Sequence, residues 1–402
     1  MPNKILIVSE CFYPEEFKVN DIALAWKDKG YDVDVLTLIP TYPIGNVFSG
    51  YKNRFLIKDE YLGIKIFRLY AVSGYRDSKF KKILKYLNFM VLGSVVSIFI
   101  GRKYDYVFGF NLGPLTDMLP AVLIKKLYKK PVMFWVQDIW PDSVYAYGFK
   151  KTKLLAILLD GFVKFMFNNI SVIAITSKGF KNKIEPYLAK NLHFVYAPNW
   201  ADELHMQAET IVLSEAQKVH FTFAGNVGKV QNLENIIAAF SRLTDRYQTD
   251  SQLNIIGDGS NLTYLKEISN NNPNIKFFGN QLRKEMSKFY QASDFLIVSL
   301  IDKEVFSVTV PAKTQTYISA QKPILAIING AVSDIVNENN LGISVNPSDI
   351  ELITKAFIKC IDMPESEKNQ YTVNNQKLIE SIFNKENIIN DITRELISSK
   401  SI

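Results

Sequence analysis

Two residue types that would mark a metal site or a disulfide framework are scarce in this chain. Its 402 residues include two cysteines and three histidines. Cys11 and Cys360 lie far apart in the sequence. The histidines form neither an HxxxH nor an HExxH pattern: His193, His205 and His220. We therefore expect no bound metal and no disulfide framework, a pattern typical of a protein from a reducing cytosol.

The sequence also gives no reason to expect a targeting segment or a low-complexity tract. The first apolar run, residues 4–8, is too short for the core of a signal peptide and is typical of a strand. No repeat of solenoid period occurs. Hydrophobic residues make up 48% of the chain and charged residues 22%, which is close to ordinary globular composition. The length therefore suggests two or three domains, each with a core of its own.

The chain has an excess of positive charge, with a formal net charge of +7. This excess favours an anionic partner such as a nucleotide, a phospholipid or a nucleic acid, or else reflects a solvated basic surface. No basic patch is interleaved with aromatic residues in the pattern of a known nucleic-acid-binding module. We therefore expect no nucleic-acid partner.

One long segment without charge, residues 86–100, bears on membrane association. A spanning helix needs about 20 apolar residues, so this run is short. Two interpretations remain open: a buried helix of the domain, and a helix whose region 76–103 contacts the inner face of the cytoplasmic membrane. In the second, flanking basic side chains face anionic headgroups; these are Arg76, Lys79, Lys81, Lys82, Lys85, Arg102 and Lys103.

Short apolar segments alternate with helical patterns in the first half of the chain. This alternation favours a parallel sheet that is covered by helices on both faces. Strands are expected at residues 5–9, 34–38, 65–69, 106–110, 132–136 and 172–176, and helices at 21–29, 78–100, 115–127 and 154–167.

The same alternation begins again after a polar stretch at residues 201–215. Strands are expected at 220–224, 253–256, 275–278, 295–299 and 323–327, and helices at 233–246, 262–269, 284–291, 314–320 and 385–398. We expect two Rossmann-like, doubly wound α/β domains, residues 1–200 and 201–382, and a C-terminal helix, 383–402, that packs back on the first domain. Such domains place ligands at the carboxyl ends of their strands, here in a crevice where the domains face one another.

A glycine turn, residues 225–229, follows the expected strand 220–224 and leads into a helix. Gly225, Asn226 and Gly228 let backbone amides approach a phosphate, whose charge a helix N-terminus favours. Lys229 is placed to reach a diphosphate. The turn lacks the GxGxxG spacing of dinucleotide-binding folds. The alternative is an ordinary strand–helix turn with a surface lysine.

Further segments of the second half are expected to contact the same diphosphate-bearing ligand. Gly257 and Asp258 form a turn that is either a common connection or part of the site. Glu304 is placed to accept hydrogen bonds from sugar hydroxyls. Lys313, at a helix start with free amides, offers a second anion site unless the segment is only a helix cap. The remaining assigned residues are Phe278, Gly279, Val308, Thr309, Val310, Pro311 and Thr316.

Acidic and aromatic residues in the first half are candidates for binding a second substrate. Asp138 follows the expected strand 132–136, and Trp140 lies two residues further on. Carboxylates accept hydrogen bonds from sugar hydroxyls, and aromatic rings stack on sugar faces. A helix cap at Asp142 and two core tryptophans are the alternative. Tyr13 and Asn20 lie in the loop after the first strand, where Asn20 is a cap or a ligand.

Together these segments resemble glycosyltransferase family 4, whose architecture is GT-B, over nearly the whole chain. The likeness is nearer to bacterial enzymes of O-antigen, capsule and colanic-acid assembly, including N-acetylfucosamine transferases of the WbuB type. The tryptophan-bearing segment, residues 137–143, is the most specific of the motifs. The others are residues 13–14, 40–48, 225–229 and 310–317.

The resemblance implies that a sugar is moved from a nucleoside-diphosphate sugar, usually a UDP-sugar, with retention of anomeric configuration and without a metal. The second domain would bind the donor, for example UDP-N-acetylfucosamine. The first would bind a polyprenyl-diphosphate-linked glycan at the membrane. The leaving phosphate would take the acceptor proton, while Lys229 and Lys313 neutralise its charge; with Asp138 they form the expected catalytic set.

The sequence departs from the family pattern at four positions. The family carries two glutamates eight positions apart before the helix of Lys313, where this chain has Val308 and Thr316. The arginine and lysine of the family's first donor loop correspond to Asn226 and Gln231. Two alternatives therefore stay open: a non-catalytic GT-B protein that binds nucleotide sugars, and a sugar-nucleotide epimerase of the same fold.

Overall fold

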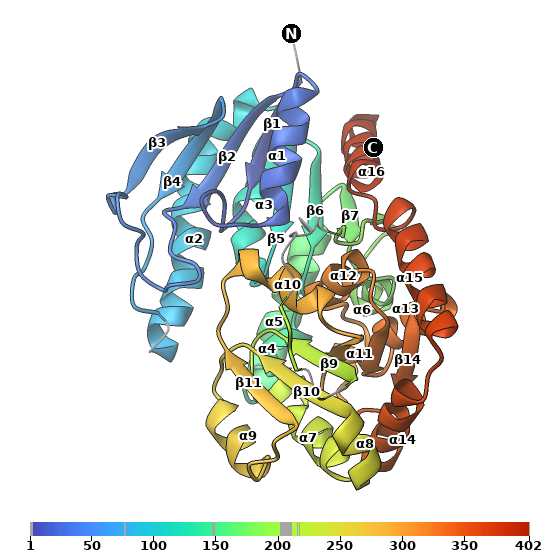
Figure 1. The fold of residues 1–402 in the computed structure, drawn as a ribbon. Helices are drawn as coiled ribbons and strands as arrows, with labels where there is room; N and C mark the ends of the chain where they lie inside the picture. The colour runs from blue at the N-terminus through green and yellow to red at the C-terminus, as the bar shows by residue number, and fades with distance from the viewer. Residues whose placement is uncertain are drawn as a thin grey trace. The chain divides into compact units, whose positions relative to one another are not determined.

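The computed structural model describes residues 3–75, 78–146, 149–201, 211–214, 216 and 218–401. It consists of two compact units (Figure 1). The first comprises Met1–Pro198 together with Glu386–Ile402, and the second comprises Asn199–Lys385. Most of the polar stretch expected at 201–215 lies outside the described residues, as does Arg76.

The first unit is built on an eight-stranded sheet in the order β3-β4-β2-β1-β5-β6-β7-β8. All neighbouring strands pair in parallel except β3 and β4. The strands are β1 Lys4–Val8, β2 Asp32–Leu38, β3 Leu56–Tyr61, β4 Ile64–Leu69, β5 Tyr106–Asn111, β6 Val132–Val136, β7 Val172–Ile175 and β8 His193–Tyr196.

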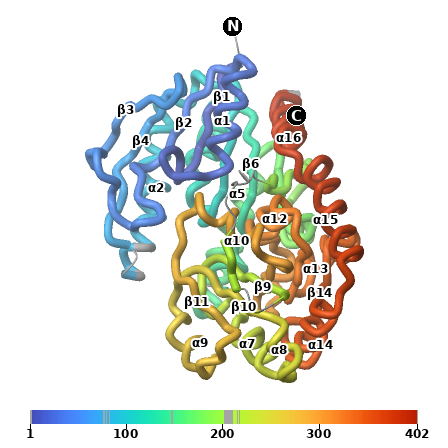
Figure 2. Tube along the Cα trace, in the orientation of Figure 1, coloured from blue at the N-terminus to red at the C-terminus, as the bar shows by residue number. Residues whose placement is uncertain are grey.

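Helices connect these strands (Figures 1 and 2). They are α1 Lys18–Asp28, α2 Lys79–Ile100, α3 Leu119–Tyr128, α4 Asp142–Ala146, α5 Lys153–Phe167 and α6 Gly179–Ile184. The C-terminal helix α16, Lys385–Ser398, also contacts this unit. The Trp26 Nε1 donates to Thr393 Oγ1 at 2.7 Å, and His193 Nε2 lies 2.9 Å from the carboxylate of Glu395. These contacts join α16 to α1 and β8.

The second unit contains a six-stranded sheet in the order β11-β10-β9-β12-β13-β14, with every pair parallel. Its strands are β9 Val219–Ala224, β10 Ser251–Ile256, β11 Ile275–Gly279, β12 Phe295–Ser299, β13 Ile324–Ile327 and β14 Gly342–Val345. Its helices are α7 Leu233–Ser241, α8 Asp245–Asp250, α9 Leu262–Ile268, α10 Met286–Gln291, α11 Glu304–Ser307, α12 Ala312–Ser319, α13 Ala331–Glu338, α14 Ile350–Ile361 and α15 Glu365–Glu380.

Several expected boundaries are corrected by the structure. The helix expected at 115–127 is divided into a 3₁₀ turn, Leu115–Met118, and α3, which begins next to Pro120. Proline lacks an N–H and is accommodated only in the first turn of an α-helix. The helix expected at 233–246 is likewise two helices, α7 and α8. Cys11 and Cys360 are buried free thiols.

Helix α2 combines a packed face with an apolar outer face. Within the described residues, the segment Ile83–Lys103 is long and apolar enough to cross a membrane by length and composition, with 28% of its most apolar window buried. Phe89 and Val96 lie in the core, whereas Phe99 is 81% exposed and Phe80 is 74% exposed. The helix therefore covers the sheet with one side and presents large apolar side chains on the other.

The expectation that Lys85 faces outward is wrong. Its Nζ lies 2.7 Å from Glu10 Oε1 and 4.3 Å from the centre of the Tyr75 ring. Asp117 completes this buried cluster, and burial together with the adjacent Glu10 carboxyl raises the pKa of Asp117. A buried carboxylate without a partner is costly, so Lys85 is drawn inward to Glu10. The side chains of Lys79 and Lys82 lie outside what the structure describes.

Candidate functional site

Two glycine turns of the second unit lie backbone against backbone at the carboxyl ends of β9 and β10. The Gly225 N–H donates to Ile256 O, and the Val227 N–H donates to Asp258 O, both at 2.9 Å. Gly257 has a φ of +131°, and a Cβ on it would lie 1.9 Å from Gly225 O. Only glycine fits there, because both the conformation and the approach exclude a side chain.

The end of β11 joins the same group of loops. The Gly257 N–H donates to Gly279 O at 2.7 Å, which continues the strand pairing into the turns. The ring of Phe278 packs edge-on against Phe289, with ring centres 5.3 Å apart. The structure therefore brings the predicted residues around Gly225, Gly257 and Gly279 together at one edge of the sheet.

Helix α12 is fixed to the end of β9 by a buried tyrosine. The Tyr317 hydroxyl accepts a hydrogen bond from the Ala224 N–H at 2.9 Å and donates to the Ala224 carbonyl at 3.2 Å. This double contact holds the helix beside the turn that begins at Gly225. The first N–H groups of α12, those of Ala312 and Lys313, have no acceptor within the helix.

Lys313 extends from α12 to the glycine turn. Its Nζ lies 3.8 Å from the centre of the Phe223 ring, and a Cβ on Gly225 would lie 3.1 Å from it. The amine is buried and has no hydrogen-bond partner among the described residues. Burial lowers the pKa of Lys313 to about 7. An amine in this state is poised to accept an anion, because a bound negative charge would restore its protonated form.

The other predicted residues around this anion site differ in their burial. Lys229 is exposed on the 3₁₀ turn that follows Gly228. The Gln231 side chain accepts a hydrogen bond from the Gly228 N–H at 3.1 Å, so it shapes the turn. Asn226 and Asp258 are exposed as well, and Asp258 Oδ1 accepts from the Gly259 N–H at 2.7 Å.

The segment before α12 contains further residues that the sequence assigns to the donor. Glu304 is exposed at the start of α11, whereas the residues that follow it are half-buried: Val308, Thr309, Val310 and Pro311. The Thr316 hydroxyl donates to the Ala312 carbonyl at 3.2 Å. Gly330 also contacts this segment, although no sequence pattern indicates it; a Cβ there would lie 2.0 Å from Ser307 O. Its positive φ of +79° lets the turn after β13 pack against α11.

In the first unit, Asp138 occupies the loop that follows β6. Its Oδ1 accepts from the Ile139 N–H at 2.9 Å. Burial raises the pKa of Asp138 to about 6, against the opposing effects of the Ser143 hydroxyl and that N–H. No ion pair to this carboxylate occurs within the described part of the chain. A carboxylate held at the end of a parallel strand with a raised pKa is a candidate for chemistry.

The two tryptophans beside Asp138 have different environments. Trp135 is in the core, and its Nε1 donates to Ala197 O at 2.8 Å. Trp140 instead borders a pocket of about 270 Å³. The pocket combines ring surfaces with polar groups, and its other lining residues are Ile139, Pro141, Asp142, Asn182, Lys183, Pro186 and Tyr187. This mixture suits a small polyhydroxylated ligand.

Tyr13 and Asn20 shape the loop between β1 and α1. The Tyr13 ring stacks on Tyr61 of β3, with ring centres 3.6 Å apart. The Asn20 side chain accepts from the Tyr13 N–H at 3.2 Å and donates to Glu15 O at 2.7 Å. Across the residues that can be described, no group of three or more histidine, cysteine, aspartate or glutamate side chains is arranged to hold a metal ion.

The architecture defines the class of protein. A structure described as "Trehalose-6-phosphate from E. coli bound with UDP-2-fluoro glucose" superposes with a TM-score of 0.74 at 12% identity, over 100% of this chain and 99% of the other. Two doubly wound units and this similarity confirm the expected GT-B fold.

Sequence comparison places the glycine turns in a known family region. Residues 207–378 match the family model of glycosyl transferases group 1. The chain is 26% identical to the probable glycosyltransferase WbjE of Pseudomonas aeruginosa, over 53% of this chain and 56% of that protein. It is 24% identical to the putative colanic acid biosynthesis glycosyl transferase WcaI of Escherichia coli, over 62% and 64%. The matches thus span less than two thirds of either relative.

Proposed function

We propose that this protein is a retaining glycosyltransferase that takes its sugar from a nucleoside-diphosphate donor. The observation that carries the proposal is the buried Lys313 amine beside the Gly225 turn. Desolvating an amine without a counter-ion costs free energy, and a diphosphate would supply the missing charge. The match to glycosyl transferases group 1 covers the same loops.

The donor is proposed to be a UDP-sugar. The structurally similar trehalose-6-phosphate protein is described with a bound UDP-2-fluoro glucose, which favours uridine as the base. Lys313, the free amides of α12 and the exposed Lys229 would stabilise the charge that develops on the leaving diphosphate. The leaving phosphate would accept the proton of the acceptor hydroxyl, so the protein itself need not supply a base.

The acceptor is proposed to bind at the first unit. The pocket beside Trp140 offers ring surface together with carboxylate, amide and ammonium groups, as a saccharide requires. Asp138 lies, like Trp140, in the segment that follows β6, and it would orient an acceptor hydroxyl. The β1–α1 loop, with Tyr13 and Asn20, is also proposed to contribute to the acceptor site. The acceptor itself would be a polyprenyl-diphosphate-linked glycan.

Helix α2 supports the proposed location at the inner face of the cytoplasmic membrane. Its outer side carries Phe80 and Phe99, whereas its inner side packs on the sheet through Phe89 and Val96. Because the inner side packs against the sheet, the helix would lie along the headgroup region and would not span the bilayer. Lys81, which is exposed near its start, would face anionic headgroups.

The pathway is proposed to be O-antigen or capsule assembly. The relative WcaI is named for colanic acid biosynthesis, which agrees with a role in surface polysaccharides. The likeness to WbuB-type transferases favours a UDP-N-acetylaminosugar such as UDP-N-acetylfucosamine. The absence of the family's glutamates at Val308 and Thr316 would then alter how the donor sugar is held.

Transfer of labelled sugar from UDP-sugars to polyprenyl-diphosphate-linked glycans tests the proposal. We expect Lys229→Ala, Lys313→Ala and Asp138→Ala each to lower turnover by at least about 10²-fold, as for loss of one charge-stabilising group. Lys276→Ala, an exposed lysine of β11, is the matched control.

The outcome separates the alternatives. Wild-type turnover in all three variants would remove the site assignment. Donor binding without sugar release in the presence of acceptor would instead support a non-catalytic nucleotide-sugar-binding protein. Conversion of the donor sugar without any acceptor would support an epimerase.

A further inference from the structure

A second pocket lies at the amino-terminal edge of the first unit's sheet, at the opposite end of its strands from Asp138. Asp105, Pro131 and Ser171 directly precede β5, β6 and β7, and all three line it. Its volume is about 570 Å³. The remaining lining comes mainly from the end of α3 and the C-terminus: Lys125, Lys126, Tyr128, Lys129, Lys130, Asn169, Ser399 and Lys400.

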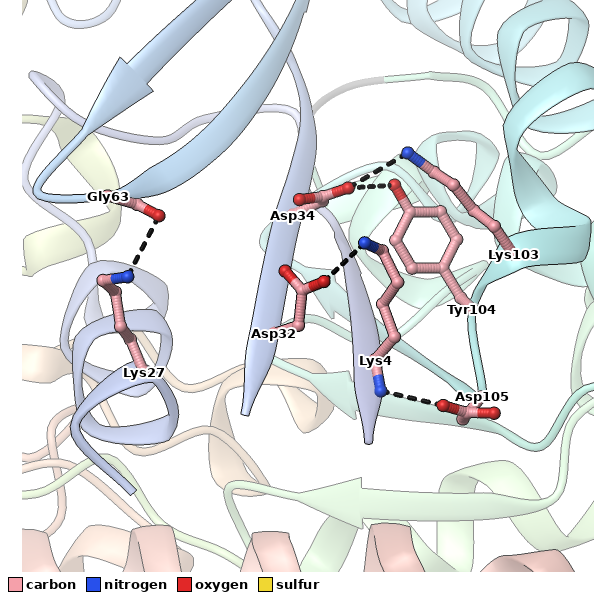
Figure 3. Close-up of polar contacts among 8 residues, drawn as sticks. All are labelled: Lys4, Lys27, Asp32, Asp34, Gly63, Lys103, Tyr104 and Asp105. Carbon is pink, nitrogen blue, oxygen red and sulfur yellow. Dashed lines mark hydrogen bonds and ion pairs between the residues drawn. The ribbon is translucent and has the colours of Figure 1, made fainter. Parts of the chain in front are cut away.

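The charge in this pocket is not balanced. Five lysines line it, against the single acid Asp105. One oxygen of Asp105 already accepts from the Lys4 backbone N–H at 2.9 Å (Figure 3). Within the described ranges, none of the five lysines forms an ion pair. Lys125 hydrogen-bonds to the Ser171 hydroxyl, and burial together with the charge of Lys190 lowers the pKa of Lys125 to about 8.

The neighbouring part of the same sheet edge shows the opposite arrangement. Lys4 Nζ pairs with Asp32 at 2.5 Å, and Lys103 Nζ pairs with Asp34 at 3.1 Å (Figure 3). Tyr104 also donates to Asp34, at 2.6 Å. Lys4 and Lys103 at this part of the edge are therefore each paired with an acid, unlike the lysines of the pocket. A helix C-terminus favours cations in its last turn, which accounts for Lys125 and Lys126 but not for Lys130 and Lys400, which lie outside α3.

We propose that this pocket binds a phosphate-bearing ligand. Lysine ammonium groups bind phosphate as point charges, and five of them around one cavity would hold a group of two or more negative charges. The Ser171 hydroxyl and the Asn169 amide would supply additional donors. The site is separate from Lys313 and does not depend on the proposed transferase activity.

The surroundings of the pocket point to two sources of such a ligand. Tyr128 donates its hydroxyl proton to the carbonyl of Ile98 on α2, and Lys126 Nζ lies 5.2 Å from the centre of the Phe165 ring on α5. Both helices carry exposed apolar side chains, including Phe99 and Leu154. The phosphate is therefore either that of a phospholipid headgroup or that of a soluble phosphate or diphosphate.

Residue-resolved lysine acetylation, read by mass spectrometry, tests this proposal on the full chain. The probes are inorganic pyrophosphate and phosphatidylcholine vesicles with or without phosphatidylglycerol. We expect acetylation of Lys126 and Lys129 to slow about tenfold when the anion is at about ten times its dissociation constant. Lys58 and Lys65, exposed on β3 and β4, are the internal controls and should keep their rates. If only vesicles with phosphatidylglycerol slow the acetylation of the pocket lysines, the ligand is a phospholipid headgroup. If pyrophosphate slows their acetylation, the ligand is a soluble phosphate or diphosphate.

A pair of variants of equal charge completes the test. The double variant Lys126→Gln/Lys129→Gln should abolish the protection of Lys130, whereas Lys58→Gln/Lys65→Gln should leave it intact. Protection of Lys313 by pyrophosphate reports on the donor site separately, so failure of one site does not imply failure of the other. The proposal is overturned if neither probe protects the pocket lysines, or if the control lysines are protected equally.

Discussion

Lys313 and Asp138 are ionisable side chains held in environments that disfavour their charged forms. Burial lowers the pKa of the Lys313 amine and raises the pKa of the Asp138 carboxyl. Neither group has an opposite charge paired with it in the described part of the chain. Such groups reduce stability, so a ligand explains them more readily than folding does.

Asp138→Asn separates a functional from a structural role of this carboxyl. Its pKa of about 6 exceeds the ordinary value of 3.8, so the native state binds the proton more tightly than the unfolded chain. Native stability is therefore lost as pH rises from 3.8 through about 6. Asparagine avoids this loss, so the free energy of unfolding of the variant relative to wild type should rise by about 1–3 kcal/mol between about pH 4 and pH 8.

Urea denaturation at the two pH values measures this difference. If the free energy of unfolding depends on pH in the same way in the variant and the wild type, the pKa of Asp138 is not raised in the native state. The variant should also lose transfer activity, because the charge it lacks is the one assigned to acceptor binding. A stable but inactive Asp138→Asn protein is thus the signature of a functional carboxylate.

Sequence patterns located these residues but not their environments. Lys229 and Lys313 were predicted as equivalent cations, yet one is exposed and the other is buried over Phe223. Lys85 was placed on an outer basic face and instead pairs with Glu10. Burial of this kind depends on residues far away in the sequence, which local periodicity does not contain.

Among the elements, the buried strands of both sheets were predictable. Short apolar runs followed by turns mark β1, β6, β9 and β12, because parallel strands are covered on both faces. The strands that were missed carry weaker signals. β3 is a half-exposed edge strand with polar residues, and β8 and β14 are edge strands that are only partly buried.

Helix α2 shows why composition alone does not decide the role of an element. Its apolar segment would suit either a core or a bilayer, and the structure gives it a packed face and an exposed apolar face. Phe99 lies near its end on the exposed face. The proposed contact with the membrane surface depends on this face, and not on the length of the helix.

Replacing apolar side chains on this face should weaken lipid binding. Burying one large apolar side chain contributes about 1.5–3 kcal/mol, so Phe99→Ser/Val95→Ser should lower the affinity for phosphatidylglycerol-containing vesicles at least about tenfold. Co-sedimentation measures the affinity. Leu282→Ser/Tyr264→Ser, which alters exposed apolar residues of the second unit, is the matched control. Equal binding by both double variants and wild type would remove α2 from the proposed contact.

At the scale of the whole molecule, the repeated strand–helix pattern predicted two doubly wound α/β units. The structure divides the chain after Pro198 and assigns Glu386–Ile402 to the first unit. The carboxyl ends of the strands in each unit gather the residues that the sequence singled out. The contacts that join them, such as Tyr317 to Ala224 and Gly257 to Gly225, were not foreseeable, since they link separate loops.

Isothermal titration calorimetry with UDP tests whether Lys313 and the glycine turns hold a nucleoside diphosphate. Since burial lowers the pKa of the free amine to about 7, the amine is largely neutral at about pH 8. A bound diphosphate raises that pKa, so binding should take up a proton and weaken as pH increases above 7.

We predict that UDP binding at about pH 8 takes up a proton, seen as a dependence of the heat on buffer ionisation. Lys313→Met should lose this uptake and bind at least about tenfold more weakly, because a charge-assisted hydrogen bond contributes about 1.5–3 kcal/mol. Lys276→Met should match wild type. Equal affinity and equal proton uptake in wild type and Lys313→Met would show that Lys313 does not bind the diphosphate.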